Sequence, residues 1–294
     1  MHSAGRAPTF RRVKRGRSSR TASFVTFVRA LAHDGFTDVR GFSDPTAREL
    51  LDDKARARLE KAERRLRSGG ARSGRQRLLQ KAVDLLALRT LVIDEAVERE
   101  LRRGTRQLVL LGAGLDGRAW RLPGLAESRA FEVDHPDTQA AKRARLGALK
   151  PSAARVDFVP VDFERDSLGD SLARAGHESG APTVWVWEGV VMYLTLGAVR
   201  ATLQAIAARS ARGSVLVVYY HTEKHRGLAA LLLRLVGEPN RSSFSPAELA
   251  RELASVGFAV EMDERAVEWS ARFGGSVRDK GTARIARIAV ARRS

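Results

Sequence analysis

The feature that most constrains the fold is an alternation of short, β-rich runs with helical stretches, which begins at residue 107. Such alternation is typical of a mostly parallel sheet with helices on both of its faces. We therefore predict an α/β fold built on a Rossmann-like sheet of seven strands. The predicted strands are, in order, QLVLLG, RAFEVD, RVDFVPVD, TVWVWEG, SVLVVYY, FAVEMD and RIARIAVAR.

The residues before the first strand follow a different pattern. Residues 1–20 are basic and carry too little apolar surface to offset the entropy of ordering, so they predict a disordered arm. In residues 21–104 apolar side chains recur at spacings of three and four, which predicts an N-terminal helical layer with a break at RSGGARSG. We treat residues 21–294 as a single domain, with the Rossmann-like core in residues 105–294.

The composition excludes several kinds of protein. The chain has 294 residues, of which 44% are hydrophobic, enough for a substantial core. It has no cysteine, so disulfides, thiolate nucleophiles and cysteine-based zinc sites are excluded. No apolar run reaches the roughly 18 residues that span a bilayer, and no apolar segment follows the basic N-terminus as in a secretory signal. We therefore predict a cytoplasmic protein without a membrane partner.

The formal charge of +18 raises the question of nucleic-acid binding. Much of the excess lies in the first twenty residues and in residues 54–77, which lack the interleaved aromatic residues of a single-strand platform. The basic residues are mostly arginine, accompanied by abundant alanine and glycine, a bias that a GC-rich coding sequence produces by itself. We therefore expect an incidental affinity for polyanions, and no nucleic acid as substrate.

A glycine-rich loop follows the first strand. Residues 112–117 read GAGLDG and match the G-x-G-x-x-G pattern of a dinucleotide-binding loop. A dinucleotide fold needs a full helix whose N-terminus faces the pyrophosphate. Here Pro123 and Gly124 follow soon after Gly117, so we expect a helix of only about one or two turns. The loop fits a nucleotide-containing cofactor, and the short helix argues against NAD.

Carboxylates follow at the strand ends, where the cofactor of a parallel sheet lies. Asp134 ends the second strand, 22 residues after Gly112, at the position where an acidic side chain holds a ribose diol. Asp162 and Phe163 follow the third strand, where a carboxylate and an adjacent N–H could contact an adenine edge. Both observations are compatible with NAD as well as with other adenosine-containing cofactors.

Together with WEGVVMYL after the fourth strand, these segments resemble a known family. Seven short pieces in this order and spacing are similar to S-adenosylmethionine-dependent methyltransferases related to leucine carboxyl methyltransferase, including bacterial members of unassigned substrate. The resemblance implies a class I methyltransferase fold and S-adenosyl-L-methionine as cofactor. The pieces are SRTA (19–22), DPTA (44–47), LALRT (86–90), LLGAGLDGRAWRL (110–122), FEVDHP (131–136), PVDFERD (160–166) and WEGVVMYL (187–194).

The resemblance also implies which residues bind the cofactor. Arg89 would pair with the methionine carboxylate, and Glu188 would lie near the amino group or the sulfonium. Gly117 is a departure, because the family commonly has a small hydroxylated residue there. The other implied contacts are Gly112, Gly114 and Asp116 in the glycine loop, Asp134 at the ribose, and Asp162 with Phe163 at the adenine.

Without the resemblance, the same positions have structural explanations. Glycines 112 and 114 could serve only a tight turn between strand and helix. A buried Arg89 needs a carboxylate partner, which Asp94 or another protein acid could provide as readily as a cofactor. Asp134 and Glu188 could cap the helices that follow them. These alternatives stay open at the level of the sequence.

The candidate catalytic residues follow the fourth and fifth strands. A carboxylate acceptor needs no general base, whereas a hydroxyl acceptor benefits from one within about 3 Å. Tyr220 and His221, together with Tyr219, end the fifth strand and are the candidate bases, and Tyr193 could face the sulfonium through a cation–π interaction. We predict methyl transfer by in-line displacement to an oxygen, carboxylate or hydroxyl, of a small molecule.

The segment after the fifth strand predicts a helical lid over residues 222–256. Its Arg234 and Arg241 suggest an anionic acceptor, and Ser245 begins a capping box that predicts a helix start. His221 and His225 have the spacing of two ligands on one helix face, but no third ligand is evident, so we predict no metal.

Other functions remain as alternatives. An NAD-dependent oxidoreductase or a non-catalytic cofactor-binding module would require neither the short helix nor WEGVVMYL. An RNA methyltransferase would need an N-P-P-Y type segment where WEGV stands.

Overall fold

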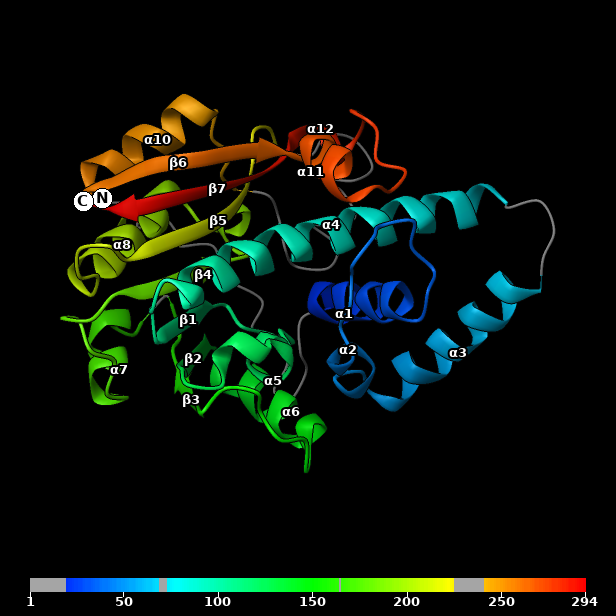
Figure 1. Ribbon diagram of the computed structural model, residues 1–294, viewed down its shortest axis with the longest axis horizontal. Helices are drawn as coiled ribbons and strands as arrows, with labels where there is room; N and C mark the ends of the chain where they lie inside the picture. Colours follow the sequence, from blue (N-terminus) through cyan, green and yellow to red (C-terminus); the bar gives the residue numbers. More distant parts are fainter. Residues whose placement is uncertain (1–19, 69–72, 164, 225–240) are drawn as a thin grey trace, which may run out of the picture.

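The computed structural model describes residues 20–68, 73–163, 165–224 and 241–294 and contains a seven-stranded sheet (Figure 1). The strand order is β3-β2-β1-β4-β5-β7-β6, in which β7 alone runs antiparallel to its neighbours. This arrangement confirms the predicted α/β fold. The strands are β1 (Gln107–Leu111), β2 (Arg129–Asp134), β3 (Arg155–Pro160), β4 (Thr183–Trp187), β5 (Val215–His221), β6 (Phe258–Arg265) and β7 (Ala286–Arg293).

The N-terminal layer is helical, as its spacing predicts. It consists of α1 (Arg20–His33), α2 (Thr46–Glu49), α3 (Asp53–Arg67) and the long α4 (Gly74–Arg102). Helix α4 begins with a capping box, in which Ser73 and Gln76 each accept a hydrogen bond from the other's backbone N–H. In Figure 1 it runs from the helical layer across to the sheet, so it connects the two parts of the domain. The predicted arm, residues 1–19, lies outside the described residues.

The remaining helices connect the strands. As the proline and glycine predict, the helix after the glycine loop is a single turn, α5 (Arg118–Arg121), followed by a 3-10 turn at η1 (Pro123–Leu125). The others are α6 (Pro136–Leu146), α7 (Leu168–Arg174), α8 (Leu196–Ala208), α10 (Pro246–Ser255), α11 (Ala266–Phe273), α12 (Thr282–Ile285) and the 3-10 turn η2 (Val191–Tyr193).

The two faces of the sheet carry alternate residues of each strand, as the two-residue period of a strand requires. One face packs against the N-terminal layer, and its buried residues include Val186 and Tyr219. The other face packs against α7, α8 and α10, and its buried residues include Trp187 and Tyr220. Neighbouring residues of one strand therefore lie in different cores, which decides which of them can reach a shared site.

Helix α10 lies within the predicted lid of residues 222–256 but covers the sheet. Its capping box is present at Ser245 and Glu248, as the sequence predicts. However, Leu249 and Leu253 are buried in the core between the sheet and α8, so α10 belongs to the layer that covers the sheet. The helix, which falls within the predicted lid, packs against β6. Residues 225–240 of the predicted lid lie outside the described residues.

Candidate functional site

A cavity of about 1020 Å³ lies at the carboxyl ends of the central strands. Its inner wall is formed by the glycine loop after β1, by Asp134 at the end of β2, and by residues 188–190 after β4. Its outer wall is formed by α1, by one face of α4 and by residues 277–283 before β7. Strands β1 and β4 are neighbours in the sheet although they are not consecutive in the chain, so the cavity lies at the topological switch point where α/β folds bind ligands.

The glycine loop brings bare backbone to the cavity wall. Gly112 and Gly114 have φ angles of +66° and +46°, in the left-handed region that favours glycine. A Cβ atom on Gly112 would lie 2.3 Å from Cγ2 of Val190, which is closer than two carbon atoms can approach. Both the backbone conformation and the space therefore require glycine at 112, beyond the general need for a tight turn.

Asp134 closes this loop and faces the cavity. Its Oδ2 accepts a hydrogen bond from the Gly114 amide at 2.5 Å, and its Oδ1 accepts one from the His135 amide at 2.6 Å. Burial raises the pKa of Asp134, and the two amide donors offset only part of that effect. Each carboxylate oxygen has a second lone pair, so Asp134 can still accept two hydrogen bonds from a ligand.

Glu188 of the inner wall and Arg89 of α4 form an ion pair. Nε of Arg89 lies 2.6 Å from Oε1 of Glu188, and the guanidinium stacks on the ring of Tyr219 at 4.8 Å. Burial favours the neutral carboxylic acid, but the charges of Arg89 and Arg118 outweigh it and lower the pKa of Glu188. The partner that a buried Arg89 requires is therefore Glu188, and not Asp94.

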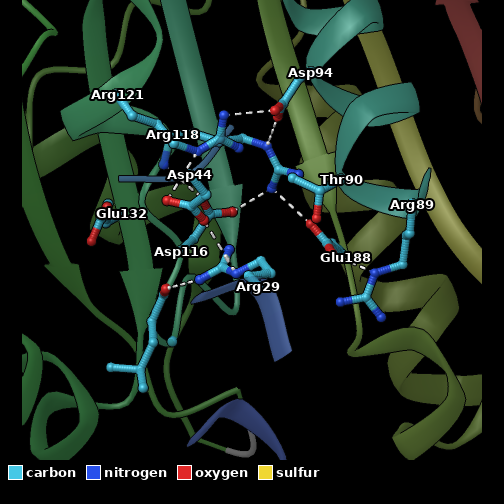
Figure 2. A network of polar contacts seen from close by, with 12 residues as sticks. Arg29, Asp44, Arg89, Thr90, Asp94, Asp116, Arg118, Arg121, Glu132 and Glu188 are labelled. Atoms are coloured by element: carbon cyan, nitrogen blue, oxygen red, sulfur yellow. Dashed lines mark hydrogen bonds and ion pairs between the residues drawn. The ribbon is translucent and has the colours of Figure 1, made fainter. Parts of the chain in front are cut away.

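Arg118 connects the acidic residues around the cavity (Figure 2). Its side chain is fully buried and contacts Asp94 at 2.7 Å, Asp116 at 2.5 Å and Glu188 at 2.7 Å. The contacts continue through Arg121 to Asp94 and Asp44, and Arg29 also pairs with Asp44. Four guanidinium groups, those of Arg29, Arg89, Arg118 and Arg121, thus meet four carboxylates, those of Asp44, Asp94, Asp116 and Glu188.

This network fixes the shape of the loop. Burial opposes ionisation of Asp116, yet Arg118, Arg29 and Lys142 lower its pKa to about 2, so the carboxylate is charged at neutral pH. Both of its oxygens are engaged by Arg118, one by the backbone N–H and one by the guanidinium. Asp116 lines the cavity, but its hydrogen bonds hold the loop in place.

Gly117, the departure from the family pattern, lies against α2. A Cβ atom there would lie 1.9 Å from Oγ1 of Thr46, whose hydroxyl donates to Asp44 at 2.6 Å. The hydroxyl of Thr46 thus occupies the space that a side chain at 117 would fill. The segment DPTA, which contains Asp44 and Thr46, therefore packs closely against the glycine loop at Gly117.

The candidate catalytic residues separate according to the face of the sheet on which they lie. Tyr193, Tyr219 and His221 line the cavity, and the Tyr219 hydroxyl lies 2.9 Å from Nε2 of His221. Tyr220 is buried on the opposite face and donates to Asp263 at 2.7 Å, so the structure contradicts its proposed catalytic role. The physical reason is the alternation of side chains along β5. His221 ends strand β5, and His225 lies outside the described residues.

The adenine candidates are divided in a similar way. Phe163 lines the cavity, whereas Asp162 does not contribute to its wall. Asp162 lies near Arg165, with Oδ2 3.9 Å from the Nε of that arginine. The structure therefore brings together Arg89, Gly112, Gly114, Asp116, Asp134, Phe163, Glu188, Tyr193 and His221, and leaves out Asp162 and Tyr220.

Apart from Arg89, the residues of α4 and of segment 277–283 that line the cavity were not predicted as site residues. On α4, Leu78, Lys81, Leu85 and Arg89 line the cavity at spacings of three and four, a pattern that the sequence contains but that also fits an ordinary packed helix. Residues 277–283 carry no comparable signal, because a loop reaches the cavity only through the tertiary fold.

No helix in the described parts of the chain combines the length and apolar character needed to cross a membrane. Within the same residues, no group of three or more histidine, aspartate or glutamate side chains is placed to hold a metal ion.

Comparison with solved structures supports the fold. A DUF574 family protein from Streptomyces avermitilis superposes with a TM-score of 0.62 at 16% identity, over 95% of this chain and 99% of the other. A protein from Thermobifida fusca, provisionally named a methyltransferase, gives a TM-score of 0.55 at 16% identity over 90% of this chain and 97% of the other. At this identity the likeness establishes the fold alone.

Comparison of sequences identifies relatives and the family. A Frankia alni protein, provisionally named an S-adenosyl-L-methionine-dependent methyltransferase, is 38% identical over 54% of this chain and 56% of its own length. A Mycobacterium marinum protein with the same kind of name is 41% identical over 50% of this chain and 49% of its own. The matched part of the chain thus spans about half the length of these relatives. The leucine carboxyl methyltransferase pattern matches residues 22–207, more than half of this chain. The chain belongs to the leucine carboxyl methyltransferase family, as its sequence motifs predict.

Proposed function

We propose that the protein is an S-adenosyl-L-methionine-dependent methyltransferase that transfers a methyl group to an oxygen atom of a small molecule. The observation that carries the proposal is the convergence of the glycine loop, Asp134 and Glu188 on one cavity at the switch point of the sheet. Membership of the family and the names of the relatives support the same activity.

The inner wall fits the chemical groups of this cofactor. A ribose diol would be held by Asp134, whose oxygens face the cavity beside the Gly114 amide. The methionine carboxylate requires a cation, and Arg89 supplies one. The positive amino and sulfonium groups require negative charge, which Glu188 provides because its low pKa keeps it ionised. The bare backbone at Gly112 lets a ligand approach where any other residue would collide with Val190.

The cofactor, when bound, supplies an electrophilic methyl group on a sulfonium, so the protein's task is to bind, align and exclude water. The network around Arg118 keeps Glu188 and the loop in fixed positions, because each buried charge has a partner. The ring of Tyr193 lines the same cavity and is proposed to face the sulfonium through a cation–π interaction.

The acceptor decides whether a proton must move. A carboxylate acceptor is already ionised at neutral pH and needs no base. For a hydroxyl acceptor, we assign proton acceptance to His221, which lines the cavity beside Tyr219. Burial raises the pKa of Tyr219, so its hydroxyl stays protonated. For His221 to act as the base, its Nε2–H must donate to the Tyr219 oxygen, so that the lone pair on Nδ1 takes the proton of the acceptor.

Isothermal titration with S-adenosylmethionine, with NAD in parallel, tests the proposal. We expect saturable binding of S-adenosylmethionine to the wild-type protein. Asp134→Asn should weaken it by about ten-fold or more, because an amide removes the charge that two ribose hydroxyls would share.

The matched control is Asp170→Asn, the same change at an exposed carboxylate in the first turn of α7, far from the cavity wall. It should leave the affinity unchanged. Circular dichroism melts of both variants show whether the fold is retained. Binding of NAD in place of S-adenosylmethionine, or equal affinities for all three proteins, would contradict the proposal.

A further inference from the structure

The outer part of the cavity differs in chemistry from the inner wall. Its mouth carries two exposed apolar side chains, Phe24 on α1 and Leu78 on α4, with 50% and 70% of their surfaces accessible. Both side chains belong to the wall of the same cavity, and apolar surface gathered in a cavity is typical of ligand-binding sites. The cofactor groups discussed above engage the inner wall, so this surface is available to the second substrate.

Three cations share this part of the wall. Lys81 comes from α4, while Arg278 and Lys280 come from the segment before α12. Within the described parts of the chain, none of the three side chains has a carboxylate within ion-pair distance. The guanidinium groups of Arg89, Arg118 and Arg121, in contrast, are each paired with a carboxylate.

The fold brings these cations together. Asp84 of α4 accepts hydrogen bonds from both the amide and the hydroxyl of Ser276, at 2.8 and 2.7 Å. Lys81 lies one helical turn before Asp84, and Arg278 lies two residues after Ser276, so the attachment sets the loop beside the lysine. Figure 1 shows the segment between α11 and α12 alongside the N-terminal half of α4.

The residues of α4 that line the cavity form a row along the helix. Leu78, Lys81, Leu85 and Arg89 line the cavity in sequence, from the exposed end of the helix to the Glu188 pair. Lys81 and Arg89 are eight residues apart, which corresponds to about 12 Å along the helix. The wall between them carries the apolar side chains of Leu85 and Leu86. A second substrate that reaches from Lys81 toward the cofactor groups at Arg89 must therefore be elongated and pass an apolar stretch of wall.

We infer that the methyl acceptor is an amphipathic small-molecule anion, whose anionic group is anchored by Lys81, Arg278 and Lys280 and whose apolar body extends along α4 toward the methyl-transfer position. That this ligand is the methyl acceptor rests on the proposed function, whereas the anion site can be tested without it. About 12 Å of helix separates Lys81 from Arg89, which is assigned to the cofactor, so the proposal makes the anchored group distinct from the methylated oxygen.

The test uses three probes of equal chain length that cannot mimic the cofactor: decane-1-sulfonate, decan-1-ol and decyltrimethylammonium. Each is titrated, below its micelle-forming concentration, into the protein with S-adenosylhomocysteine present. We expect saturable binding of the sulfonate and at least ten-fold weaker binding of the cationic probe. The variant K81Q/R278Q/K280Q should weaken sulfonate binding by at least ten-fold and leave decanol binding within about two-fold.

The matched control is R58Q/K61Q/K150Q, which removes the same charge from residues outside the cavity wall and should bind the sulfonate like the wild type. Equal affinity of both triple variants, or preference for the cationic probe, would overturn the inference. A further result would also overturn it: the wild type binds anionic vesicles but not the free sulfonate, and K81Q/R278Q/K280Q no longer binds the vesicles. The three cations would then bind a membrane surface.

Titration of S-adenosylmethionine into the same proteins separates the two proposals. If the sulfonate binds as expected but S-adenosylmethionine does not, the proposed function fails and the anion site stands. If S-adenosylmethionine binds equally to the wild type and both triple variants but the sulfonate does not bind, only the acceptor class is wrong.

Discussion

The buried charges around Glu188 show how a cavity can be both polar and rigid. Taking a carboxylate and a guanidinium out of water costs several kcal/mol for each ion, so close partners of opposite charge must offset this loss of hydration. The fully buried side chain of Arg118 contacts three carboxylates, and these contacts fix the position of each carboxylate. Such a network resists rearrangement, which is what a site that aligns two substrates requires.

Gly112 gives a residue-scale prediction. Gly112→Ala places a methyl group on a backbone with φ of +66° and 2.3 Å from Val190, so both strain and collision oppose it. We expect affinity for S-adenosylmethionine to fall by at least about ten-fold and the melting temperature to drop, as measured by titration and circular dichroism.

The double variant Gly112→Ala/Val190→Ala separates the two causes. It removes the collision and keeps the strain, so part of the stability should return relative to Gly112→Ala. Val190→Ala alone is the control for the loss of the valine side chain. A Gly112→Ala protein with wild-type affinity and stability would show that neither effect operates at this position.

At the scale of the elements, the sequence predicts what depends on local patterns. The capping box at Ser245 and the interruption at Pro123 both describe neighbouring residues, and both are present in the structure. The role of α10 is not local: its apolar stripe predicts burial, but not whether the stripe meets a sheet or a ligand cavity. The prediction of Tyr220 as a catalytic residue is wrong for another reason. The register of β5 determines which of two adjacent side chains faces the cavity.

Asp84 gives an element-scale prediction, because it joins α4 to two loops. Its carboxylate accepts hydrogen bonds from Thr37, Asp38, Gln80 and Ser276 and is fully buried. Asp84→Asn replaces one acceptor oxygen by a donor that faces other donors, which should cost about 1–3 kcal/mol of unfolding free energy. Urea denaturation measures the loss, and hydrogen exchange should show faster exchange of the amides of residues 274–283.

Asp279→Asn is the control for that experiment. It makes the same substitution in the same segment, but at an exposed side chain whose nearest cation, on Arg265, is 3.8 Å away. Its effect should stay below about 1 kcal/mol, as for other exposed ion pairs. Similar losses of stability in the two variants would contradict the anchoring role of Asp84.

At the scale of the whole molecule, the sequence identifies the inner wall but not the outer one. The motifs after β1, β2 and β4 lie at strand ends that a parallel sheet must bring together, so their meeting follows from the fold class. The positions of α1 and of residues 277–283 depend on contacts between distant parts of the chain, such as that of Asp84 with Ser276. No local pattern encodes those contacts, so the cations of the mouth emerge only in three dimensions.

The net charge of +18 gives a prediction for the molecule as a whole. We expect duplex DNA to bind without sequence preference, with an affinity that falls by at least about ten-fold between about 50 and 200 mM salt. Fluorescence anisotropy with two unrelated duplexes measures both properties. Tight, sequence-selective binding at the higher salt concentration would contradict an incidental affinity and favour a nucleic-acid substrate.

The position of β7 has a consequence for synthesis on the ribosome. Strand β6 lies at the edge of the sheet and pairs with β7 alone, although it precedes β7 in the chain. Until residues 286–293 leave the exit tunnel, β6 has no partner, and residues 277–283 cannot be held in place between the two strands. The mouth of the cavity is therefore completed after the rest of its wall has been synthesised, so a nascent chain can form the glycine loop well before it can form the whole site.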